Sequence, residues 1–200
     1  MPNFPPLAPG EMYHVCTRGN NREDLFTSDH DRRHFLGLCE SRLLPVADLF
    51  AYCLLSSHFH LLLRFRERSV EDPAPGNAPS RVMADMLNAY ARAFNLDHGR
   101  RGALFQRPFR RVLVKEPQQL TRVVVYIHLN PERHGLVPDF RSWTFTSFHA
   151  ILSARPTRLG REEVLDWFGG RRGFAQSHTG AYPFPPNPAL DLERESEPTT

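Results

Sequence analysis

Two histidines, one residue apart in a hydrophobic run, are the first candidates for chemistry in this 200-residue sequence. Residues 54–64 read LLSSHFHLLLR, which predicts a short turn followed by a β-strand. Alternate side chains share one face of a strand, so His58 and His60 should point the same way. Two imidazoles on one face can hold a divalent cation. An isolated pair of this kind more often belongs to a solvated strand face, so a second group of residues must decide.

That second group lies within residues 121–137, on a predicted helix whose first turn can include Pro117. Tyr126 and Asn130 are four residues apart and therefore share one flank of the helix. A tyrosine hydroxyl can act as a nucleophile, although an aromatic side chain on a helix flank is by itself usually packing. The core face of the helix is given by apolar residues at helical spacing, namely Leu120, Val123, Val124 and Ile127.

Together these motifs resemble the single-tyrosine HUH transposases and, more narrowly, the REP-associated tyrosine transposases. The helix reads YIHLNP and is followed by ERHGLV. The other matching segments are YHV at 13–15, RGNNR at 18–22, AYCLL at 51–55 and GALFQRPF at 102–109. The resemblance covers about residues 12–170. The sequence departs from many relatives at Ser56-Ser57, where they have Pro-Asn, and at Phe105, where they have Trp.

The resemblance implies a metal-dependent endonuclease and strand transferase that acts on single-stranded, hairpin or repeat DNA. Tyr126 would be the nucleophile and would form a covalent 5′-phosphotyrosine, while His58, His60 and Asn130 would hold Mg²⁺ or Mn²⁺. Ser57 is shorter than an Asn amide, so weaker support of the histidine ligands is expected. One alternative is a non-catalytic module that recognises DNA hairpins. A hydrolase of small phosphoesters is a third interpretation, and it lacks the usual carboxylates.

The charge distribution fits a polyanionic partner. The formal net charge is +3, and the last 14 residues carry −3, which leaves +6 on the rest of the chain. All basic residues but Lys115 are Arg, which suits bidentate phosphate contacts but would also follow from a GC-rich genome. The candidates for DNA binding are Arg18, Asn20, Asn21, Arg22, Arg107, Arg110, Arg111 and Arg122.

The order of elements predicts an α+β fold with a ferredoxin-like βαββαβ core, an antiparallel sheet with helices on one face, and a C-terminal extension. Strands are expected at residues 12–17, 49–55 and 58–64, with an edge strand in 103–115. A first helix should begin at a capping box formed by Ser28 and Asp31, and a second should begin after Ser80 and stop at His98. The histidine pair would then sit mid-sheet.

The expected domain organisation is a lead at residues 1–11, the transposase domain at 12–139, an extension at 140–185 and a disordered acidic tail at 186–200. A short helix is expected at 161–170. Three cysteines without close spacing suggest neither a disulfide framework nor a zinc site. With no apolar run long enough to span a membrane, we expect a cytoplasmic, nucleoid-associated bacterial protein that acts as a monomer or homodimer.

Overall fold

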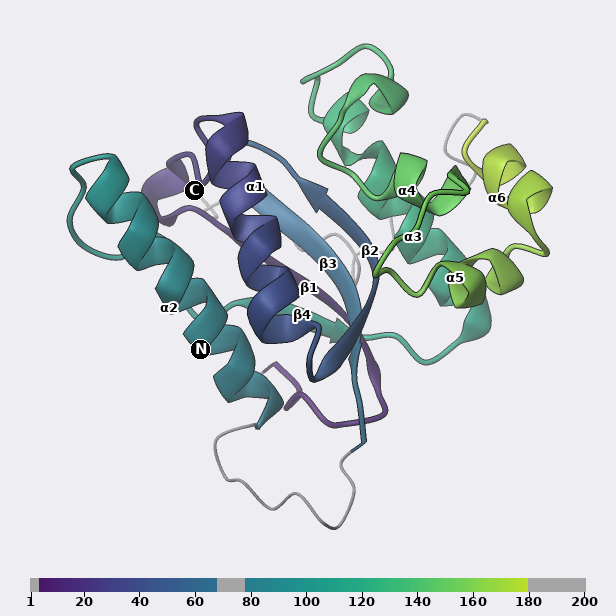
Figure 1. Cartoon of the computed structure of the whole chain (residues 1–200), viewed down its shortest axis with the longest axis horizontal. Coiled ribbons are helices and arrows are strands. Elements are labelled where there is room, and N and C mark those ends of the chain that lie inside the picture. The colour runs from purple at the N-terminus through teal and green to yellow at the C-terminus, as the bar shows by residue number, and fades with distance from the viewer. Residues whose placement is uncertain (1–3, 68–77, 180–200) are drawn as a thin grey trace, which may run out of the picture.

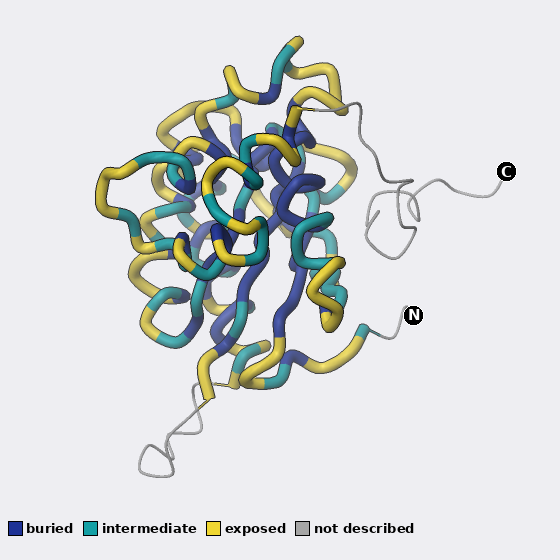
Figure 2. Tube along the Cα trace, turned by 90° about the vertical axis from the view of Figure 1, so that its right-hand side faces the viewer, coloured by how far each residue is buried: buried dark blue, intermediate teal, exposed yellow. Residues whose placement is uncertain are grey.

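A four-stranded antiparallel sheet forms the centre of the protein, in the order β2-β3-β1-β4 (Figure 1). The computed structural model describes residues 4–67 and 78–179. The strands are β1 (Met12–Arg18), β2 (Ala47–Leu54), β3 (His58–Phe65) and β4 (Arg110–Leu113). The two central strands, β1 and β3, are almost wholly buried (Figure 2). This strand order and the βαββαβ succession confirm the predicted ferredoxin-like class.

Helices α1 (Asp29–Leu38) and α2 (Pro79–Asp97) cover one face of the sheet. The chain continues from α1 as a π-helical turn, Cys39–Leu43, before Pro45. The predicted capping box at the start of α1 is present, because Ser28 and Asp31 bond reciprocally to each other's backbone N–H groups. Helix α2 begins one residue before the predicted cap, with Ala78 as N-cap and Pro79 in the first turn.

Helix α3 (Pro117–Arg133) covers the opposite face. The prediction placed helices on one face only, which is right for α1 and α2 but leaves out α3. Because side chains alternate along β1, Met12 faces α3 whereas Tyr13 faces α1 and α2. The apolar residues Val123 and Val124 of α3 pack into this second core, as their helical spacing predicted.

The edge strand is shorter than predicted. Only Arg110–Leu113 pairs with β1, because Pro108 has no N–H to donate to a ladder. The residues before it bond instead to the end of β1 and the turn that follows: Gln106 N donates to Arg18 O and Asn20 N donates to Leu104 O. This turn is the short 3₁₀ helix Asn20–Arg22, in which Asn21 and Arg22 have positive φ angles.

The C-terminal segments pack on α3 and along the outer edge of β2. They comprise a 3₁₀ turn (Phe140–Ser142) and the short helices α4 (Phe148–Leu152), α5 (Arg161–Trp167) and α6 (Arg171–Ser177). The predicted helix over 161–170 is α5. The extension packs on the core, because Phe148, Val164 and Phe174 are buried against the α3 face.

Some predictions concern residues outside the described ranges. The acidic tail predicted at 186–200 lies entirely outside them, and the proposed domain boundaries stay a prediction. Within residues 4–67 and 78–179, no helix has both the length and the hydrophobicity needed to cross a bilayer.

Candidate functional site

The two histidines of β3 lie on the face of the sheet that α3 covers. Their ring centroids are 5.2 Å apart, which confirms that they share a face. His60 stands opposite Cys16 of β1 and Cys53 of β2, in the middle of the sheet, while His58 stands opposite Arg18 at its end. Both imidazoles are buried.

The turn before His58 is held by backbone bonds from the segment after β1. Ser57 O accepts from Gly19 N at 2.8 Å, and Ser56 O accepts from Leu25 N at 2.7 Å. Position 19 requires glycine, because a Cβ there would meet Glu23 O at 1.9 Å. These bonds fix where β3 begins and therefore where His58 points.

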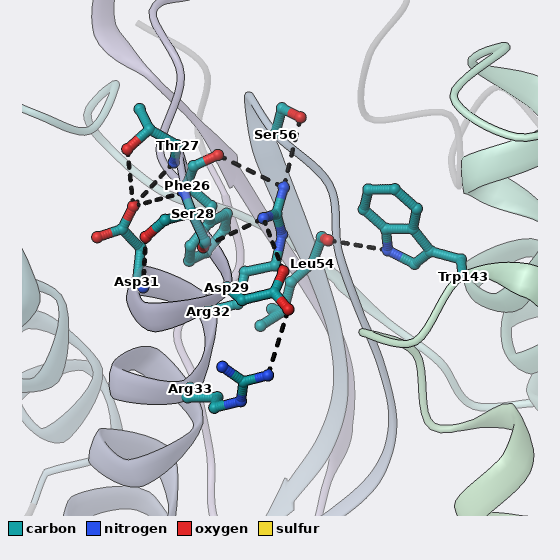
Figure 3. A network of polar contacts seen from close by, with 10 residues as sticks. All are labelled: Phe26, Thr27, Ser28, Asp29, Asp31, Arg32, Arg33, Leu54, Ser56 and Trp143. Carbon is teal, nitrogen blue, oxygen red and sulfur yellow. Dashed lines mark hydrogen bonds and ion pairs between the residues drawn. The ribbon is translucent and has the colours of Figure 1, made fainter.

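A buried arginine of α1 supports the same turn from outside (Figure 3). The Arg32 guanidinium donates to Phe26 O at 3.4 Å and to Ser56 Oγ at 3.5 Å. Close by, Trp143 Nε1 donates to Leu54 O at 3.1 Å, which joins the C-terminal extension to the end of β2. The first helix and the extension thus meet at the turn that carries the histidines.

Ser57 does reach the first histidine. Its Oγ lies 3.1 Å from His58 Nδ1. The shorter Ser57 side chain therefore reaches the ring of this predicted ligand, and the weaker support expected from it stays a prediction. A contact at Nδ1 leaves Nε2 as the nitrogen with which His58 would bind a cation.

A third histidine, which sequence reasoning left without a role, completes the group. His14 Nε2 lies 3.0 Å from His60 Nδ1, with both side chains fully buried. His14 is a diagonal neighbour of His60, because its own register partner on β3 is Leu62. It lies in the YHV motif, and the period-two pattern of β1 puts it on the face of Met12. Its pairing with His60 depends on strand register, which the sequence does not show.

Helix α3 places Tyr126 against these imidazoles. The Tyr126 ring centroid is 5.5 Å from that of His60 and 5.8 Å from that of His14, edge-on in both cases. Tyr126 is only 2% exposed. The predicted nucleophile and one predicted ligand are therefore in direct contact, although they are 66 positions apart in the numbering.

Asn130 lies one turn after Tyr126, and its side chain is oriented so that the amide oxygen Oδ1 can act as an acceptor. Its Nδ2 donates to Tyr126 O at 2.7 Å, and since a carbonyl only accepts, the amide nitrogen must face that oxygen. Its Oδ1 is buried and has no hydrogen-bond partner. A buried amide oxygen in this state has unused coordinating capacity.

The donor set fits a weakly bound divalent cation. No group of three or more His, Cys, Asp or Glu side chains suited to a metal occurs in residues 4–67 and 78–179. A cation bound by the imidazoles of His58 and His60 would therefore need the Asn130 amide oxygen and water molecules to complete its coordination shell. Neutral nitrogen and oxygen ligands of this kind suit Mn²⁺ at least as well as Mg²⁺.

Two basic residues at the end of α3 cover the group. The Arg133 Cζ atom lies 4.8 Å from the centre of the Tyr126 ring, and His134 stacks edge-on at 4.8 Å from His58. Both are exposed to solvent. They close the site on the side where α3 ends.

Two other buried or half-buried tyrosines, Tyr52 and Tyr90, are poor candidates for a nucleophile. Burial raises the pKa of Tyr52 to about 12. The Tyr90 hydroxyl donates to Leu25 O at 2.6 Å, and burial raises its pKa further still. Both rings pack in or against the core under α1 and α2, on the sheet face opposite the histidine group.

The predicted DNA-binding residues do not form one surface. Arg18 and Arg110 belong to the site face, because they stand opposite His58 and Cys16 in the register, and Arg122 lies one turn before Tyr126. Arg111 turns to the other face and donates to the carbonyls of Phe4 and Pro5. Arg107 bonds to Asn88 of α2 at 2.9 Å. The remaining candidates, Asn20, Asn21 and Arg22, form the turn after β1.

A row of buried hydrogen bonds holds α3 against the C-terminal segments. His128 Nε2 lies 2.7 Å from Ser147 Oγ, and His128 Nδ1 lies 2.9 Å from His178 Nε2. His178 Nδ1 in turn lies 2.7 Å from Phe174 O and must donate to it. Burial lowers the pKa of His128 well below its usual value and that of His178 to about 4, so both rings are neutral.

Comparisons with known proteins agree with these motifs. A Haemophilus influenzae protein named for the REP-associated tyrosine transposases is 28% identical over 106 residues, which is 52% of this chain and 60% of that relative. The chain is thus similar in sequence to a member of the transposase family that its motifs resemble. The resemblance drawn from the motifs is thereby confirmed, although no protein-family model matches the sequence.

A solved structure extends the likeness to three dimensions. It is the structure of a REP-associated tyrosine transposase bound to a REP hairpin, with a TM-score of 0.57 and 19% identity over 80% of this chain and 92% of that one. At this identity the match shows a shared fold with that transposase. The chain matches only 60% of the length of the Haemophilus relative.

Proposed function

We propose that the chain is a transposase-like endonuclease and strand transferase that cleaves single-stranded DNA beside hairpins or repeats, using Tyr126 as nucleophile and a divalent cation. The observation that carries this proposal is the contact of Tyr126 with two buried imidazoles, one turn before a buried amide oxygen without a partner. The relative with a shared fold was solved with a REP hairpin, which supports hairpin DNA as the substrate.

In this reaction Tyr126 Oη bonds to the scissile phosphorus and the bond from phosphorus to the 3′-oxygen breaks. The phenol proton ends on the departing 3′-oxygen, and the DNA 5′ end stays linked to the tyrosine. A later 3′-hydroxyl can reverse the exchange and rejoin strands, so the bond energy is kept and no nucleotide cofactor is needed.

The cation would be held by His58, His60 and Asn130. When bound, it would polarise a non-bridging phosphate oxygen and orient the phosphate. Ser57 and His14 orient the two imidazoles through their Nδ1 atoms. Arg18 and Arg110, on the same face, would bind neighbouring phosphates.

The second candidate function is a module that binds DNA hairpins without cutting them. The observation in its favour is burial: Tyr126 is 2% exposed and lies under Arg133, so a phosphate reaches the hydroxyl only after that cover moves. A binding module needs no such opening, whereas the transposase proposal requires it.

Two alanine substitutions test the proposal. In His58→Ala and His60→Ala, cleavage of a hairpin taken from the flanks of the chain's own gene should be lost in Mn²⁺, while DNA binding changes little. Phosphate contacts and metal chemistry use different residues, which is the reason for this split. Gel analysis of cleavage beside fluorescence anisotropy of binding measures both, with exposed His30→Ala as the matched control.

Normal cleavage by both variants would show that the metal site is misassigned. A wild-type protein that binds the hairpin but cuts none in Mn²⁺ or Mg²⁺ would favour the binding module instead.

A further inference from the structure

A cavity of about 640 Å³ opens between α2 and residues 102–109. It lies on the side of the sheet that α1 and α2 cover, since Phe105 belongs to their core and its ring contacts that of Phe59. The candidate site is on the other face. The cavity is therefore separate from the histidine group, and its volume falls in the range of about 300–1,000 Å³ that is usual for small-ligand pockets.

The walls are apolar and partly aromatic. Leu87 and Ala91 line the α2 side, and Leu104, Phe105 and Phe109 line the loop side. The alanine leaves room beside the helix, and Phe109 is half-buried, so part of its ring is open to a ligand. A flat apolar ring could stack here.

The rim is polar and carries positive charge. Arg107 donates to Asn88 Oδ1 at 2.9 Å, and Arg92 lies one turn further along α2. Asn95 bonds to Gly102 O at 2.9 Å and holds the loop against the helix. Among the described residues that line the cavity, there are two Arg and no Asp or Glu. Such a rim favours a ligand that carries negative charge and has groups that can form hydrogen bonds.

The cavity adjoins the predicted DNA-binding turn. Gln106 N donates to Arg18 O, and Phe105 forms a bridge with Gly19. Arg18 is in turn the register partner of His58. Gln106 is thus separated from His58 by one strand, β1. Neighbouring strands are about 4.8 Å apart, so the loop lies two such spacings from His58. A DNA strand that leaves the candidate site along this edge of the sheet would meet the cavity.

We propose that this cavity binds one unpaired nucleobase of the DNA substrate, stacked on Phe109, with Arg92 and Arg107 on the flanking phosphates. The proposal rests on the proposed function, in that it requires the chain to bind unpaired DNA. It assigns sequence selection to a site on the sheet face opposite the nucleophile. Aromatic walls supply stacking, amides and guanidinium groups supply hydrogen bonds, and the charge matches a phosphodiester.

An abasic scan tests the site. The probe is a DNA hairpin with unpaired flanks from the chain's own gene, with a single abasic residue at each unpaired position in turn. Wild-type protein should bind one of these probes about five- to a hundred-fold more weakly than the intact hairpin, the range expected for loss of one stacked base. Fluorescence anisotropy measures the affinities.

Two variants connect that position to the cavity. Ala91→Trp fills the cavity and Phe109→Ala removes the stacking ring without overpacking; each should bind the intact hairpin more weakly and lose its sensitivity to the abasic position. Leu96→Trp is the matched control, because it adds the same ring to α2 at a position that is 82% exposed. Circular dichroism checks that each variant folds. If Ala91→Trp does not fold, the result for Phe109→Ala decides alone.

Full abasic sensitivity in the folded variants would overturn the proposal, as would a wild-type protein that binds the hairpin with no sensitive unpaired position. Failure of wild-type protein to bind any hairpin or single strand would instead overturn the proposed function, and this inference with it.

Discussion

At the scale of single residues, the candidate site depends on how neutral side chains orient one another. Ser57 contacts His58, His14 contacts His60, and the backbone of Tyr126 fixes the Asn130 amide. Each predicted ligand thus has a partner that directs its remaining nitrogen or oxygen. No charged residue is needed for this, which agrees with the burial of the whole group.

His14 gives the first prediction at this scale. In His14→Ala the His60 Nδ1 atom loses its buried contact, so Mn²⁺ affinity should fall about 10- to 100-fold, the usual effect of removing a residue that orients a ligand. His14→Asn, which keeps a hydrogen-bonding group, should recover part of the affinity. Isothermal titration calorimetry with Mn²⁺ measures the effect, and His30→Ala controls for the loss of an exposed imidazole. Unchanged Mn²⁺ affinity in His14→Ala would mean that His14 does not position His60.

At the scale of elements, the start of α1 links the first helix to the second. Burial by itself raises the pKa of Asp31, but hydrogen bonds from His98, Thr27 and Ser28 outweigh it and hold the pKa at about 2. His98 caps the end of α2, at 3.0 Å from Asp31 Oδ1. One carboxylate therefore serves as helix cap and as a tie between two helices.

This carboxylate should make stability depend on acid pH. Its pKa is lower in the folded protein than the ordinary value of 3.8, so the stabilisation is complete above about pH 4 and is lost as the pH falls towards 2. Asp31→Asn should lower the free energy of unfolding by about 2 kcal/mol at pH 7, with little difference near pH 2. Urea unfolding at both pH values tests this, with the more exposed Asp29→Asn as control. An equal loss at both pH values would refute the linkage.

Most of the fold could be predicted because its signals are local. The alternation in β3, the capping box of α1 and the helical spacing in α3 are each complete within a few residues. The position of His14, the face taken by α3 and the split among the Arg residues depend on register and packing between distant segments. The length of the edge strand was overestimated, because side chains alternate along residues 103–109 as they do in a strand. Pro108 interrupts the pairing, so β4 is short.

At the scale of the whole molecule, the C-terminal helices hold α3 in place. The chain from Ser147 through His128 to His178 joins the edge of β2, α3 and the residue after α6. Its hydrogen bonds are complete only when both imidazoles are neutral, because His178 Nε2 must accept from His128 Nδ1. Protonation of His128 or His178 would therefore break the hydrogen bonds that join the C-terminal helices to α3.

Stability should accordingly fall between pH 6.5 and pH 4. The unfolded chain binds a proton at His178 near its ordinary pKa of 6.5, whereas in the folded chain burial lowers this pKa to about 4. Acid therefore favours unfolding across that window, by about 3 kcal/mol for this residue. His178→Gln keeps an acceptor for His128 and should flatten the pH dependence of thermal unfolding, while exposed His149→Gln should not. The same slope in wild type and His178→Gln would contradict this account.

The proposed reaction passes through a covalent intermediate on Tyr126, and detecting that intermediate tests the reaction. A hairpin with unpaired flanks, incubated with the protein and Mn²⁺, should give an adduct that survives denaturation, and mass spectrometry of a protease digest should place it on Tyr126. Tyr126→Phe keeps the ring against His60 and His14, so it should fold, bind the hairpin and form no adduct. An adduct on Tyr52 or Tyr90, or undiminished adduct in Tyr126→Phe, would contradict the assignment.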